Sequence, residues 1–209
     1  MEGVDKDPNL RAAVLCAQGK SFCAGANFNS DGTSSNQSGG SDTADRSSHL
    51  YVEAVRLFAT KTPIVGAIQG AAIGGGFGLS LVPDFRVACP EARFAANFTR
   101  LGFHPGFGLT HTLPSLIGHQ KASLMFYTSR RIKGEEAYQW GLADMLVPLE
   151  EVRQSAISLA QEIAENQKQA GDMTAERKEL NGLINKLIDE KEKFTEEMDV
   201  LRQDVNAYG

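Results

Sequence analysis

The chain has 209 residues, of which 42% are hydrophobic and 22% are charged, and its formal net charge is -5 at pH 7. A domain usually takes about 100–200 residues, so we expect one core with an appendage. Nucleic-acid binding is disfavoured because phosphate contacts need concentrated Lys and Arg. No apolar run approaches the roughly 20 residues that span a bilayer, and residues 1–5 lack the apolar core of a signal peptide. We therefore expect no membrane partner and a cytoplasmic location, with a mitochondrial location as an open alternative.

Short apolar runs alternate with helical patterns through most of the chain. Strands are predicted at residues 11–17, 63–68, 85–88, 94–96 and 146–147, the first two of them buried. Helices are predicted at residues 50–58, at 74–82, in short pieces from 116 that break at Gly118 and Gly134, and at 149–166. This alternation indicates an α/β fold. Residues 29–48 are Ser, Gly, Asp and Asn with almost nothing apolar, which predicts a mobile surface loop.

The composition changes near residue 168. Residues 168–209 carry 17 charges in 42 residues, whereas residues 1–167 carry 30 in 167, so we expect a body at 1–167 and a separate charged tail at 168–209. Five apolar tail residues are spaced by seven, a spacing typical of heptad position d: Met173, Leu180, Leu187, Phe194 and Leu201. Three of the five residues at position a, four places later, are also apolar: Ile184, Met198 and Val205.

This spacing predicts a coiled-coil or helical-hairpin seam. A single amphipathic helix that lies on its own domain is the alternative. The charged residues at the other two a positions, Arg177 and Lys191, weaken the seam, as does Gly182.

Two glycine-rich segments follow predicted strands. Residues 19–28 have small side chains at 23–26, which let the backbone approach a ligand closely. Residues 70–78 open a helix, whose free N–H groups favour negative charge. Two such segments that face each other would form an oxyanion hole; tight turns with glycine at positive φ are the alternative. Neither a dinucleotide fingerprint nor a P-loop is matched.

The three cysteines, Cys16, Cys23 and Cys89, have no metal-ligand spacing and an odd count. We therefore expect no disulfide framework, no metal and a reducing compartment.

Five motifs occur in order: FCAGAN at 22–27, PIVGAIQGAAIGGG at 63–76, DFRVA at 84–88, LGFHPGFG at 101–108 and GLAD at 141–144. Together they resemble the crotonase (enoyl-CoA hydratase/isomerase) family over roughly residues 8–167. The resemblance implies a spiral of repeated ββα units, here incomplete and followed by the helical, coiled-coil-like tail. It also implies an acyl-CoA partner, no cofactor beyond the coenzyme A of the substrate, a role in fatty acid metabolism, and a homo-oligomer, usually a trimer or dimer of trimers.

The resemblance also assigns site residues. The N–H groups of Ala26 and Gly75 match the pair that holds the thioester oxygen, and the carbonyl of Ala24 matches a contact to the adenine of CoA. A thioester gains enolate character when its α-proton leaves or when a nucleophile adds at its β-carbon. Two fixed N–H donors stabilise that charge.

The positions of the family's acids hold residues that cannot move a proton. Gly78 and Phe98 match the two glutamates of the hydratases, and Gly106 matches an aspartate found in some isomerases and dehalogenases. His104 is the best remaining titratable candidate, with a hydrogen-bonded loop residue as the alternative. Phe77, Phe98 and Phe103 are expected to wall an acyl group, with core packing as the alternative.

We therefore expect an enzyme of the lyase or isomerase class that processes an acyl-CoA thioester. Isomerisation, retro-Claisen cleavage or a non-standard hydration would fit, because ordinary two-glutamate hydration is disfavoured. Two other functions stay open. The missing acids favour an inactive acyl-CoA-binding protein, and the heptad tail favours an assembly protein. The chain begins almost at its first strand, and the resemblance stops near Asn166.

Overall fold

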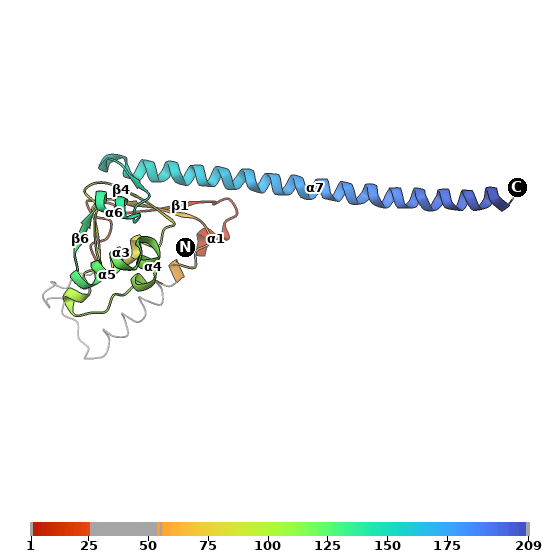
Figure 1. Cartoon of the computed structure of the whole chain (residues 1–209). Helices are drawn as coiled ribbons and strands as arrows, with labels where there is room; N and C mark the ends of the chain where they lie inside the picture. Colours follow the sequence, from red (N-terminus) through yellow and green to blue (C-terminus); the bar gives the residue numbers. More distant parts are fainter. Residues whose placement is uncertain (1, 26–53, 55, 208–209) are drawn as a thin grey trace, which may run out of the picture. The chain divides into compact units, whose positions relative to one another are not determined.

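The computed structural model describes residues 2–25, 54 and 56–207, and the side chains of the last helix as far as residue 189 (Figure 1). The predicted loop at 29–48 and the predicted donor Ala26 lie outside the described residues. The chain divides into two compact units, Met1–Ala164 and Glu165–Gly209.

The first unit contains two sheets whose strands alternate along the chain. One is a parallel sheet in the order β1 (Ala13–Cys16), β2 (Ile64–Ile68), β4 (Phe85–Ala88) and β7 (Met145–Leu146). The other has the order β3 (Ala71–Ile73), β5 (Arg93–Ala95) and β6 (Arg131–Lys133), with β3 parallel and β6 antiparallel to β5. Thus β2 and β4 enter the first sheet, while β3 and β5, which follow them directly, enter the second.

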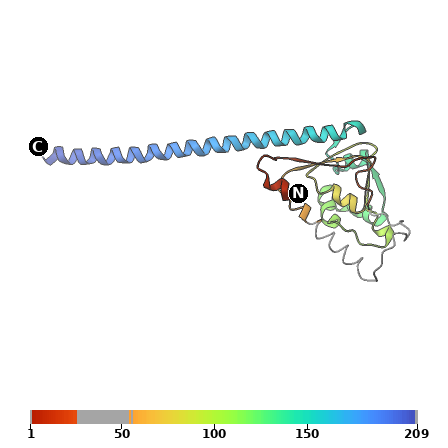
Figure 2. The ribbon, with the colours of Figure 1, turned by 180° about the vertical axis from the view of Figure 1, so that it is seen from behind.

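Helices follow the strand pairs β2–β3 and β4–β5 along the chain. The described helices before α7 (Val152–Ala207) are α1 (Glu2–Lys6), α3 (Gly75–Ser80), α4 (Leu109–Ile117), α5 (His119–Thr128) and α6 (Gly134–Trp140), with 3-10 turns η1 (Thr99–Leu101) and η2 (Leu149–Glu151). The order β2–β3–α3 followed by β4–β5–η1–α4 is the repeated ββα unit that the resemblance implies. Figure 2 shows the same ribbon from behind. The predicted α/β crotonase-like fold is confirmed.

The burial of each strand follows its place in the sheet. All five residues of β2 are buried, because this strand lies between two others and is covered on both faces. The prediction of a buried first strand is wrong in degree: β1 is an edge strand, its first three residues are half-buried and Cys16 is exposed.

Helix boundaries also differ from the sequence prediction. Helix α4 begins at Leu109, seven residues before the predicted start, and the short strands β3 and β6 were not predicted. Helix α7 (Val152–Ala207) does not end at residue 166 but continues through the charged segment without a break.

A buried guanidinium joins β4 to the segment before β7. The side chain of Arg86 donates to the carbonyl oxygens of Leu142 (2.7 Å), Pro83 (2.6 Å) and Asp84 (3.1 Å) and reaches the Asp144 carboxylate at 3.3 Å. Burial lowers the pKa of Arg86, whereas the charges of Asp144 and Asp84 raise it. The cation therefore satisfies backbone acceptors directly before β4 and where the chain turns from α6 into β7.

Candidate active site

The two glycine-rich segments lie side by side. Cys23 pairs with Ala72 as an isolated parallel bridge. The N–H of Cys23 donates to the Ala71 carbonyl at 2.9 Å, and the N–H of Ile73 donates to the Cys23 carbonyl at 3.0 Å. The first segment thus adds to β3 as a further partner, which places it beside the start of α3.

The contact is close enough to require glycine on both sides. A β-carbon on Gly76 would collide with the carbonyl oxygen of Cys23. A β-carbon on Gly25 would lie 2.8 Å from the carbonyl oxygen of Ile73. Gly25 and Gly74 also have positive φ, of 84° and 57°. Close backbone approach and tight turning therefore occur together in these segments, as expected for tight turns with glycine at positive φ.

Gly75 is the first residue of α3, directly after the turn at Gly74. Its N–H belongs to the first helical turn and so has no acceptor within the helix. Gly75 is half-exposed, and apart from its chain neighbours and the backbone of its own helix no described residue lies within 4 Å of a β-carbon built on it. Ala24 is exposed at the end of the described part of the first segment, and Ala26 lies beyond it.

The position that the resemblance assigns to the first acid, residue 78, is covered by an aromatic side chain. Gly78 is buried in α3, and a β-carbon on it would lie 2.5 Å from the β-carbon of Phe107. Phe107 itself has φ of 55° and meets Phe58 edge to face, with 6.2 Å between ring centroids. Phe107 therefore occupies the space that a side chain at residue 78 would need.

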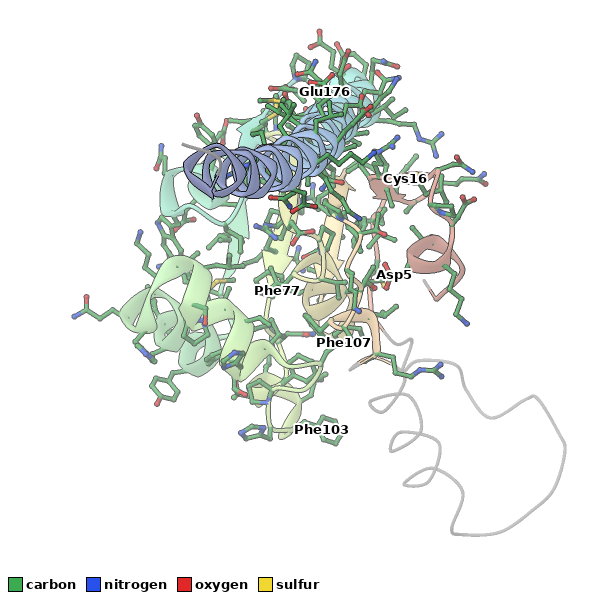
Figure 3. The ribbon with its side chains drawn as sticks, turned by 90° about the vertical axis from the view of Figure 1, so that its right-hand side faces the viewer. Asp5, Cys16, Phe77, Phe103, Phe107 and Glu176 are labelled. Carbon is green, nitrogen blue, oxygen red and sulfur yellow. The ribbon has the colours of Figure 1, made fainter. Side chains whose placement is uncertain are left out.

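The three phenylalanines expected to wall an acyl group have different environments. Phe77 is fully buried and packs on Phe94, with 5.8 Å between ring centroids. This environment matches core packing, the alternative to a role in the acyl wall. Phe103 is 57% exposed and lies apart from Phe77 at the lower edge of the unit in Figure 3. Phe98 is half-buried, and its ring tip lies 3.9 Å from a β-carbon built on Gly74. Of the three, Phe98 is the one next to the glycine turn.

His104 lies exposed in the loop between η1 and α4, two residues before half-exposed Gly106. Its Nδ1 lies 3.0 Å from the carbonyl oxygen of Pro105. A carbonyl oxygen can only accept, so this bond places the proton of a neutral ring on Nδ1 and leaves Nε2 as the free base.

A pocket of about 560 Å³ opens beside the glycine turn, and its basic rim was not predicted. Its lining residues are Ile73, Ala95, Asn97, Arg100, Leu101, Thr128, Ser129, Arg130 and Arg131. No described carboxylate forms an ion pair with any of the three arginines. The pair Arg130–Arg131 is visible in the sequence, but its proximity to Arg100 arises only when β6 joins β5.

Neither a metal centre nor a membrane span emerges from the described part of the chain. No group of His, Cys, Asp or Glu among those residues is placed to hold a metal ion, and the three cysteines are free. Among the same residues, no helix is both long and apolar enough to cross a bilayer.

A family model described as "Enoyl-CoA hydratase/isomerase" matches residues 1–204. The chain is 35% identical over 147 residues to the probable enoyl-CoA hydratase EchA14 of Mycobacterium tuberculosis, covering 70% of this chain and 56% of that protein. It is 34% identical over 158 residues to carnitinyl-CoA dehydratase of Salmonella enteritidis, covering 75% and 59%. The crystal structure of an enoyl-CoA hydratase from Bacillus anthracis is 33% identical with a TM-score of 0.70, covering 78% of this chain and 62% of that one. The chain thus spans less than two thirds of the length of these relatives.

Proposed function

Because the chain belongs to the enoyl-CoA hydratase/isomerase family, we propose that it binds an acyl-CoA thioester and stabilises negative charge on the thioester oxygen. The donors are the backbone N–H groups of Gly75 and Ala26. The observation that carries the proposal is the pairing of Cys23 with Ala72, because it brings the strand-to-loop segment that leads to Ala26 beside the start of α3, where half-exposed Gly75 lies.

The chemistry needs these donors when the oxygen becomes anionic. If a base removes the α-proton, the C–H electron pair forms the enolate double bond and the carbonyl pair moves to the oxygen. If a nucleophile adds at the β-carbon of an enoyl thioester, the electrons of the double bond reach the same oxygen. Fixed N–H donors in a site that excludes water stabilise either product, and each donor contributes about 3 kcal/mol.

The proton carrier differs from a pair of glutamates. Gly78, Phe98 and Gly106 have no acidic group, so His104 through Nε2, or a bound water, moves the proton. Isomerisation, retro-Claisen cleavage and a non-standard hydration all need only one such group beside the oxyanion donors.

The other candidate residues bind rather than react. The carbonyl of Ala24 accepts from the adenine of CoA, and Phe98 contacts the acyl group beside Gly74. The arginines at 100, 130 and 131 raise the local positive potential, which draws a ligand that carries the phosphates of CoA towards this face.

Acyl-CoA binding without turnover is the second candidate. The observation that favours it is the packing of Phe107 over Gly78, because this packing fills the position of an acid with an apolar ring. This candidate retains the binding role of Gly75 but has no proton transfer.

The proposal is tested with Gly75→Pro and its matched control Gly75→Ala. Proline is tolerated at the first position of a helix but removes the N–H, whereas alanine keeps it. We expect Gly75→Pro to lower kcat/KM at least about 100-fold on a panel of enoyl-, dienoyl- and β-ketoacyl-CoA substrates, and Gly75→Ala to lower it far less. Calorimetry with each acyl-CoA separates binding from turnover, and thermal unfolding checks that both variants fold.

Two outcomes decide between the alternatives. A folded Gly75→Pro variant with wild-type kcat/KM and affinity overturns the role of this amide. A wild-type chain that binds acyl-CoA through Gly75 but converts no member of the panel establishes the binding protein instead of the enzyme.

A further inference from the structure

Helix α7 presents large apolar side chains that the second unit itself leaves exposed. Six of them, between residues 173 and 188, are 45–70% exposed: Met173, Leu180, Leu183, Ile184, Leu187 and Ile188. They belong to one unbroken helix, since α7 runs from Val152 to Ala207. A surface of this kind on a charged, solvent-exposed helix marks an interaction site.

The six residues fall on one stripe of the helix. With Met173, Leu180 and Leu187 at heptad position d, Ile184 is at a, Leu183 at g and Ile188 at e. Positions b, c and f over the same stretch hold only small or polar residues: Ala175, Lys178, Glu179, Gly182, Asn185, Lys186 and Asp189. Gly182, which weakens helix propensity, therefore lies on the face opposite the stripe.

We propose that residues 173–205 pair with the same segment of a second copy of this chain as a parallel, in-register, two-stranded coiled coil. The heptads continue in the sequence to Val205, so the paired segment has nearly five heptads, more than the three to four that a coiled coil needs. This inference does not depend on the proposed chemistry, because it concerns the second unit alone.

The residue types at a and d favour two strands. Leucine stands at d in Leu180, Leu187 and Leu201, and β-branched residues stand at a in Ile184 and Val205. β-Branched residues at a with leucine at d favour parallel dimers over larger assemblies. Arg177 at position a also favours a dimer. In a two-stranded coiled coil its charged end can reach solvent, whereas the wider core of a three- or four-stranded coil would bury it.

The charges favour a parallel orientation of the two helices and favour a second copy of this chain as the partner of the apolar stripe. In a parallel pair, Arg177 at a packs beside Glu176 at the preceding g position of the other helix, and the pattern repeats in the sequence with Glu190 and Lys191. Leu183 at g faces Ile188 at e. An antiparallel pair instead places g positions opposite g positions, which brings Glu176 and its acidic equivalents together and is repulsive.

The first test measures the mass of the full chain by sedimentation equilibrium. The variant Leu180→Asp/Leu187→Asp introduces negative charge at two d positions. The control Lys178→Asp/Lys186→Asp changes the net charge in the same direction and by more, but at positions b and c. We expect the wild type and the control to have the same even-numbered oligomeric state and the d-position variant to have half their mass. A monomeric wild type, or a d-position variant of unchanged mass, overturns the proposal.

The second test reports orientation. Leu187→Cys places a thiol at d, where in-register parallel helices bring it next to its equivalent, and Asp189→Cys places one two residues away at f. Mild oxidation should link Leu187→Cys into a dimer in most of the molecules and leave Asp189→Cys and the wild-type chain, with Cys16, Cys23 and Cys89, largely unlinked. If the chain has the mass of a dimer but Leu187→Cys does not form the disulfide-linked dimer, the helices are antiparallel or out of register, which contradicts the inference.

Discussion

The side chain of Phe107 lies directly over Gly78: a β-carbon on Gly78 would be 2.5 Å from the Phe107 β-carbon and 2.8 Å from two of its ring atoms. The two residues come from α3 and from the loop before α4. Their contact shows that the space a side chain at residue 78 would need is filled by a bulky side chain from elsewhere in the chain. The glycine and the phenylalanine therefore act as one packing unit.

This packing predicts a strong coupling between residues 78 and 107. Gly78→Ala should lower the free energy of unfolding by about 1–3 kcal/mol, because the added methyl group overlaps the phenyl side chain. In the Phe107→Ala background the same change should cost much less, which gives a coupling of about 0.5–3 kcal/mol. Urea unfolding of the four chains measures the cycle, and strictly additive effects would show that the two side chains do not compete for space.

Arg86 is predicted to contribute strongly to stability. Arg86→Ala leaves the carbonyl oxygens of Leu142 and Pro83 without their side-chain donor, so we expect a loss of about 3 kcal/mol in the free energy of unfolding. The control is Arg93→Ala, since Arg93 is exposed on β5, and its effect should stay within about 0.5 kcal/mol. Equal effects of the two substitutions would refute a structural role for the buried guanidinium.

Asp5 predicts a pH-dependent contribution to stability. The backbone N–H groups of Thr62 and Lys61 donate to its carboxylate at 2.9–3.1 Å and lower the pKa of Asp5 below its ordinary value. Because the folded state has the lower pKa, the stabilisation is present above about pH 4, the ordinary pKa, and is lost as the pH falls through the folded value.

Asp5→Asn should therefore be less stable than the wild type at pH 7, and the difference should shrink as the pH falls below about 4. Thermal unfolding of the two chains from pH 7 to pH 3 measures it, with Asp7→Asn as a nearby exposed control. A gap between Asp5→Asn and wild type that stays constant over this range would show that ionised Asp5 does not stabilise the fold.

His104 should affect turnover and not binding. If Nε2 moves the proton, His104→Gln lowers kcat by about 100-fold or more while leaving the dissociation constant for acyl-CoA nearly unchanged. The control is His111→Gln, since His111 is an exposed residue of α4, and this substitution should leave both values unchanged. Wild-type kcat in His104→Gln would assign the proton transfer to bound water and leave His104 as a hydrogen-bonded loop residue.

Continuous apolar runs made part of the fold predictable from sequence. The run at residues 63–68 predicts β2 because a strand covered on both faces needs no polar residues. The three-residue strands β3 and β6 are too short to show alternation, and β3 lies within a glycine-rich run, so local pattern does not reveal them.

The site was predictable where it depends on glycine and not where it depends on distant contacts. The small side chains at 23–26 indicated close approach of the backbone to a ligand, and the structure shows close approach of two segments to each other, at Gly25 and Gly76. The contact of Gly78 with Phe107, and the gathering of Arg100 with Arg131, join residues about 30 apart in the chain. Only the packing of the helices and the second sheet brings such pairs together.

The central claim concerns the thioester oxygen, and the most direct measurement is the crystal structure of this chain with a bound acyl-CoA. The account predicts that oxygen at about 2.7–3.1 Å from the backbone nitrogens of both Gly75 and Ala26. A bound thioester whose oxygen contacts neither nitrogen, or whose acyl-CoA lies away from the junction of Cys23 with Ala72, would contradict it.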